Sequence, residues 1–143
     1  MEFVNWIIID RPRSDVFSFV ADLENTPRWN HAIAESIRIT NGPIRVGTTY
    51  RQVRVLPRRV VEEVEITDFQ PDRRLQLRGA VGPLEGTITY DLEDLDGRTR
   101  LVNTMDLSAR GVGKLVASIA ATRARDAVGK NLLVLRGLLE ATR

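Results

Sequence analysis

The residues best suited to acid–base chemistry lie in the segment DLENTPRWNHA, residues 22–32, which holds the only histidine and one of the two tryptophans. By chemistry alone, His31 is the best general-base candidate, because its ordinary pKa lies near neutrality. The sequence places no partner beside it, so a surface or helix-terminal histidine is the alternative. Trp29 is either a core anchor or a large ring at a pocket entrance. For each of these two residues, the sequence leaves the two alternatives open.

A second group of polar residues alternates with apolar ones along predicted strands. Tyr50 and Gln52 share one strand face, Glu62 shares a face with two apolar residues, and Tyr90 and Asn103 do the same on later strands. An asparagine among inward-facing apolar residues must find a partner in the protein or offer its amide to a ligand. A few polar groups in an apolar cavity are typical of a ligand site. For each residue, core packing or solvent exposure is the alternative.

Several kinds of chemistry are excluded by what the sequence lacks. The chain has no cysteine, so it has no thiolate nucleophile or cysteine-based metal site, and one histidine cannot form a multi-histidine zinc site. The segment GVGK is too short for a phosphate-binding loop. We therefore expect no metal and no cofactor. The net charge of +2 comes from 21 bases against 19 acids without a clustered basic face, so no nucleic-acid partner is expected.

Length and composition indicate a single globular domain over residues 1–143. Hydrophobic residues make up 43% of the chain and charged residues 28%, as in ordinary soluble domains. No run reaches the roughly 18 apolar residues of a membrane span. The first ten residues hold an acid and an apolar stretch too short for a signal peptide, which predicts a cytoplasmic protein. A homodimer is left open.

Strand and helix patterns succeed one another in a simple order. Residues 3–9 predict a strand, Pro12 begins a short helix, and Asp22 or Thr26 caps a second one. From residue 34 the hydrophobic period changes to two, and six strands joined by short turns predict an antiparallel meander. Asp96-Gly97 marks its last hairpin.

Residues 113–141 predict one long helix without proline. Leu115, Ile119 and their apolar neighbours share a face in its first half, and Arg123 continues that face. Either this half crosses a partly polar cavity mouth, or the helix is bent with an exposed middle. Gly129 and Gly137 fit a close approach to the sheet or a bend.

The opening residues resemble the START-like superfamily, in particular its bacterial polyketide cyclase/dehydrase-like members. The matching features are Pro12, Val16-Phe17, Asp22 and the Pro27-Arg28-Trp29 motif, followed by Gly47 and the DGRTRL hairpin. The resemblance implies an α+β helix-grip fold. Its seven-stranded curved antiparallel sheet would surround a long C-terminal helix, with two short helices between the first two strands. In that family a cavity between sheet and helix takes an apolar or aromatic small molecule.

The resemblance and the polar inner faces together lead to three functional hypotheses. The first is binding of a hydrophobic or aromatic small molecule, such as a lipid or polyketide, in the cavity. The second is a polyketide aromatase/cyclase or dehydratase in which His31 or Glu62 removes a proton and Arg123 or a tyrosine stabilises the enolate. The third is a protein-interaction module. The predicted ligand contacts are Trp29, Tyr50, Gln52, Tyr90, Asn103, Met105, Leu115, Ile119 and Arg123.

Overall fold

The computed structural model describes residues 1–81, 83–109 and 111–142. The first strand, β1 (Glu2–Ile9), leads into helix α1 (Arg13–Ala21) and the short 3-10 helix η1 (Leu23–Arg28), which precede β2 (Ile33–Arg38). Pro12 lies just before α1, where its fixed φ suits a helix entry. The Asp22 carboxylate caps η1 by accepting a hydrogen bond from the Glu24 amide at 3.2 Å. Pro27 lies inside η1, so Asp22, and not Thr26, begins this helix.

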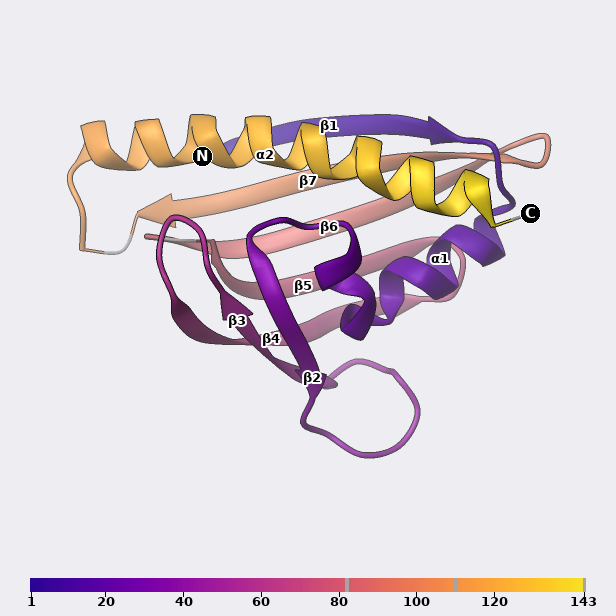
Figure 1. The fold of residues 1–143 in the computed structure, drawn as a ribbon, viewed down its shortest axis with the longest axis horizontal. Coiled ribbons are helices and arrows are strands. Elements are labelled where there is room, and N and C mark those ends of the chain that lie inside the picture. Colours follow the sequence, from indigo (N-terminus) through magenta and orange to yellow (C-terminus); the bar gives the residue numbers. More distant parts are fainter. Residues whose placement is uncertain (82, 110, 143) are drawn as a thin grey trace.

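The remaining strands form an antiparallel meander. They are β3 (Thr49–Arg54), β4 (Val60–Gln70), β5 (Arg74–Val81), β6 (Leu84–Leu95) and β7 (Arg98–Ala109). The sheet has the order β1-β7-β6-β5-β4-β3-β2, so the first strand closes against the last (Figure 1). Asp96 and Gly97 adopt positive φ in the β6–β7 hairpin, as their types predict. The predicted seven-stranded sheet is confirmed.

The long C-terminal helix α2 (Lys114–Ala141) runs beside β1 and β7 (Figure 1). The predicted helix is confirmed, but its buried face differs from the expected one. Ala117 and Ala121 face the sheet in the first half, whereas Leu115 is 75% exposed and Ile119 47% exposed. The alanines allow a close approach that larger side chains would prevent. The apolar face expected around Leu115 and Ile119 therefore points to solvent.

The two glycines of α2 have different surroundings. The Asn5 amide on β1 donates to the Arg125 carbonyl at 3.3 Å, and a Cβ on Gly129 would lie 3.6 Å from the Asn5 side-chain oxygen. Gly129 thus lies where the helix approaches β1. Around Gly137, no described atom apart from its chain neighbours and the backbone of its own helix lies within 4 Å of where a Cβ would stand, so close approach does not explain this glycine.

The core has a larger and a smaller part. The larger lies under the C-terminal half of α2, where Leu132, Leu135 and Leu139 pack against α1 and the sheet. The smaller comprises Leu84, Met105, Leu107, Ala117 and Ala121. Because small residues contribute the helix side of the smaller cluster, the first half of α2 buries less apolar surface than the second. No helix in the described ranges is long and apolar enough to cross a membrane.

Candidate functional site

The inner face of the sheet is the face toward α1 and α2, and it carries an unusual number of polar side chains. Strand alternation brings them there from four strands, since residues two apart point to the same side. Each of these side chains is buried. The set includes Tyr50, Gln52 and Arg54 of β3, Glu62 of β4, Tyr90 of β6, and Thr99 and Asn103 of β7.

Tyr90 and Asn103 form the centre of this face, because they lie directly opposite each other between β6 and β7. Trp29, at the end of η1, packs edge-on against the Tyr90 ring with a centroid separation of 6.3 Å. Burial raises the pKa of the Tyr90 phenol well above its ordinary value, and the neighbouring Asn103 amide offsets this rise only in part. The phenol is therefore protonated at neutral pH.

The Asn103 side chain is fully buried, yet neither its amide nitrogen nor its oxygen has a well-formed hydrogen bond within the described structure. Its proximity to the Tyr90 phenol affects the phenol's pKa without meeting hydrogen-bond geometry. Buried polar groups are almost always hydrogen-bonded, so an amide with both ends unpaired calls for an explanation. It leaves one donor group and one acceptor available on the inner face.

Tyr50 and Gln52 differ in how their polar atoms are used. The Tyr50 hydroxyl is buried near the Leu23 backbone, but this contact does not meet hydrogen-bond geometry, so the hydroxyl has no well-formed hydrogen bond among the described residues. Burial raises the pKa of this phenol, the charge of Asp22 raises it further, and the Leu23 backbone offsets this rise only in part. Gln52 instead donates to the Ser36 hydroxyl at 3.1 Å. Of the two, Tyr50 is the one with an unused polar atom.

Glu62 is held by an ion pair with Arg54, whose Nε donates to Glu62 Oε1 at 2.7 Å. Arg54 also reaches the Ala80 carbonyl of β5 with Nη2 at 3.5 Å. The second carboxylate oxygen of Glu62 is buried and has no partner in the described part of the chain. The sequence did not predict this pair, although Arg54 follows Gln52 on the same face and Gln52 lies opposite Glu62.

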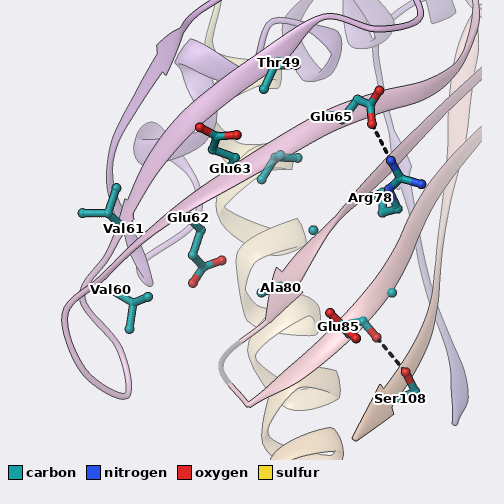
Figure 2. A pocket seen from close by; sticks show the side chains of 13 residues that line it. Thr49, Val60, Val61, Glu62, Glu63, Glu65, Arg78, Ala80, Glu85 and Ser108 are labelled. Atoms are coloured by element: carbon teal, nitrogen blue, oxygen red, sulfur yellow. Dashed lines mark hydrogen bonds and ion pairs between the residues drawn. The ribbon is translucent and has the colours of Figure 1, made fainter. Parts of the chain in front are cut away.

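A cleft opens where β4 and β5 separate (Figure 2). Its volume is about 930 Å³, and Glu62 and Val64 of β4, Gly79 and Ala80 of β5 and Gly86 of β6 are among the residues lining it. A second hollow lies between β1 and α2, with Trp6 and Lys130 among its lining residues. In the described ranges no group of three or more His, Cys, Asp or Glu side chains is arranged to hold a metal ion.

Of the other candidates from the sequence, four lie on the surface and one lies in the core. His31 and Arg123 are exposed, as are Leu115 and Ile119. Met105 is buried in the smaller core cluster. The structure thus brings Trp29, Tyr90 and Asn103 together and leaves His31 and Arg123 on the surface, where their functional roles stay predictions.

Comparison with known proteins gives a family and a fold. The sequence profile of a family described as polyketide cyclase / dehydrase and lipid transport matches residues 2–140. A START superfamily protein from Mycobacterium smegmatis has a TM-score of 0.80 at 13% identity, with 99% of each chain covered. No curated protein matches in sequence.

Two further solved structures have the same fold. The Zhui aromatase/cyclase from Streptomyces sp. R1128 has a TM-score of 0.77 at 17% identity, covering 98% of this chain and 93% of its own. The polyketide-cyclase-like protein Cgl2372 from Corynebacterium glutamicum has a TM-score of 0.67 at 20% identity, covering 97% and 91%. At such identities the likeness establishes the helix-grip architecture, and chemistry must be argued from the residues themselves.

Proposed function

The chain belongs to the polyketide cyclase, dehydrase and lipid transport family, and on that premise we propose that it binds an apolar or aromatic small molecule against the inner face of its sheet. The ligand would contact Trp29, Tyr90 and Asn103, with Tyr50 as a further polar contact. This face combines aromatic and aliphatic surface with a few polar atoms, which is the usual composition of a small-molecule site.

The unpaired Asn103 amide is the observation that carries the proposal. Burying an amide without a hydrogen bond costs about 1–3 kcal/mol in proteins, and a leucine of similar size would avoid that cost. A ligand with a polar group on an apolar body would satisfy the amide. The unpaired Tyr50 hydroxyl supports the same interpretation.

Binding is favoured over acid–base catalysis by the state of the titratable candidates. His31 is exposed and lies outside the inner-face set. Glu62 is engaged with Arg54, and the raised pKa of Tyr90 keeps its phenol protonated at neutral pH. A protonated phenol and an amide can orient a ligand by hydrogen bonds, whereas proton abstraction needs a free base. Within this set, only Oε2 of Glu62, whose other carboxylate oxygen is held by Arg54, is left as a candidate base for cyclisation of a polyketide chain.

Native mass spectrometry tests the proposal. The protein would be purified gently and its native spectrum compared with a denatured one, before and after incubation with naphthol, a neutral aromatic probe. We expect a bound mass that disappears on denaturation, or stoichiometric uptake of naphthol with a rise in Tm. An unliganded protein that takes up no naphthol and shows no change in Tm would refute it.

A further inference from the structure

Pairing between β4 and β5 ends partway along the two strands. In the described ranges, the register between these strands runs from Gln70↔Arg74 to Glu65↔Arg78 and ends there. The preceding part of β4 continues to pair with β3, and the following part of β5 continues to pair with β6. Because paired strands lie only about 4.8 Å apart, the end of pairing opens the cleft seen in Figure 2.

Glu62 places a buried acceptor in this cleft. Its side chain is only 6% exposed, and it lines the opening from β4. Oε1 accepts from Arg54, whereas Oε2 has no partner among the described residues. An ionised carboxylate can only accept hydrogen bonds. Within the described structure, Glu62 Oε2 therefore lacks a hydrogen-bond donor, which a ligand would supply as an O–H or N–H group.

The other side chains of the cleft define its charge and polarity. Its lining includes the carboxylates of Glu62, Glu63, Glu65 and Glu85 and one base, Arg78, which pairs with Glu65 at 2.6 Å. Alternation along β4 puts Glu63 and Glu65 on the sheet face opposite to that of Glu62. Arg54 is engaged by Glu62 and by the Ala80 carbonyl. An anion placed at Glu62 Oε2 would thus meet a like charge at close range. The rest of the lining consists of valine and alanine, the facing pair Gly79 and Gly86, and the hydroxyl side chains Thr49 and Ser108. The valine, alanine and glycine walls can accommodate an apolar body.

We propose that the β4–β5 cleft is a binding subsite for the hydrogen-bond-donating end of the ligand, a hydroxyl, phenol or ammonium group, and that it disfavours carboxylates. The donor binds Glu62 Oε2, and the apolar body lies against the glycine and valine walls. This subsite rests on the proposed small-molecule binding function, and it adds a preference for ligands with a hydrogen-bond-donating end over carboxylates. Charge-assisted hydrogen bonds of this kind are stronger than neutral ones.

Three probes that share a naphthalene ring test the selectivity at neutral pH: neutral naphthol, cationic naphthylmethylamine and anionic naphthoate. We expect the wild-type protein to bind the first two at least about tenfold more tightly than naphthoate, a difference of about 1.4 kcal/mol. Glu62→Gln keeps the side-chain shape and removes the charge, so the tenfold preference should fall to within about twofold. Dissociation constants would be measured by calorimetry.

Two further variants keep the test independent of folding defects. Glu93→Gln removes one charge from an exposed position of β6 outside the cleft, and it should keep the wild-type preference. The double variant Arg54→Met/Glu62→Leu replaces the buried ion pair by apolar side chains, a change that proteins often tolerate well. It should fold and bind naphthol without discriminating by charge.

Each outcome has a distinct meaning. A preference that survives in Glu62→Gln and in the double variant would overturn the subsite, as would a wild-type protein that binds all three probes alike. Tighter binding of naphthoate than of naphthol would also overturn it, since Arg54 would then dominate. If the wild type binds none of the probes, the binding function itself fails, and the subsite fails with it.

Discussion

Tyr90 and Asn103 are buried in the protein interior and also belong to the proposed ligand site. Alternation along the strands correctly placed both on one inner face, together with Tyr50 and Gln52. Their hydrogen-bonding could not be predicted, because it depends on strand register and on which loops pack above them. Ser36 satisfies Gln52, for example, only because β2 pairs beside β3. The Arg54–Glu62 pair was missed for the same reason.

The raised pKa values of the two tyrosines predict a loss of stability in alkali. An unfolded tyrosine ionises near pH 10, whereas buried Tyr90 and Tyr50 hold their protons more tightly. The unfolded state therefore binds fewer protons above about pH 10, and the free energy of unfolding must fall as the pH rises. Below that pH their contribution is fully present. The slope is at most about 1.4 kcal/mol per pH unit for each tyrosine.

Tyr90→Phe should make this alkaline slope shallower, by at most about 1.4 kcal/mol per pH unit, because Tyr50 retains its own contribution. Urea denaturation at about pH 8.5 and about pH 11 would measure the effect. The chain suits this experiment, since Lys114 and Lys130 are its only lysines. Equal slopes in the wild type and the variant would show that Tyr90 is not buried as a neutral phenol.

The helix α2 shows what hydrophobic patterning can and cannot predict about an element. Its extent was predicted almost to the residue, because 29 residues without proline have few alternatives. Its buried face in the first half was missed, because Ala117 and Ala121 carry little hydrophobic signal compared with Leu115 and Ile119. Close packing of α2 on the sheet buries the smaller side chains, Ala117 and Ala121. Which helix face is buried therefore depends on the sheet surface opposite, which the helix sequence does not contain.

Strand β6 contains a glycine that the structure requires. Gly86 has φ of 154°, and a Cβ there would lie 1.9 Å from the Asp106 carbonyl oxygen of β7. Because backbone cannot move aside cheaply, we expect Gly86→Ala to lower the free energy of unfolding by about 3 kcal/mol. Thermal and urea unfolding would measure the loss.

Gly137→Ala in α2 is the matched control. Apart from its chain neighbours and the backbone of its own helix, no described atom lies within 4 Å of its added Cβ, so this change should raise stability by about 0.5–1 kcal/mol through helix propensity. If Gly86→Ala were tolerated as well as Gly137→Ala, the close approach of β6 and β7 would be incorrect.

At the scale of the whole molecule, the order of elements was enough to predict the fold. A first strand, two short helices, a six-strand meander and a long helix leave few antiparallel arrangements, and the observed sheet is the expected one. The β4–β5 cleft was not predicted. It depends on where pairing ends within two long strands, and the local sequence signal there is a lone Gly79, directly after Arg78 in β5.

Two polar residues on the inner face of β7 allow the stability of the fold to be separated from the proposed ligand binding. Thr99 donates to the Arg11 carbonyl at 2.7 Å, so Thr99→Val should cost about 1 kcal/mol and leave ligand affinity unchanged. Asn103 makes no such bond. Asn103→Leu should therefore stabilise the unliganded protein by about 1 kcal/mol or more.

The most direct test of the proposed ligand site measures two quantities for Asn103→Leu, the free energy of unfolding and the affinity for naphthol. Wild type and Thr99→Val are measured beside it. If the inner face is a ligand site, Asn103→Leu gains stability and loses at least about fivefold in affinity, equivalent to about 1 kcal/mol. If Asn103→Leu is instead less stable than wild type and binds naphthol equally well, Asn103 serves the fold, and the proposed ligand site is wrong.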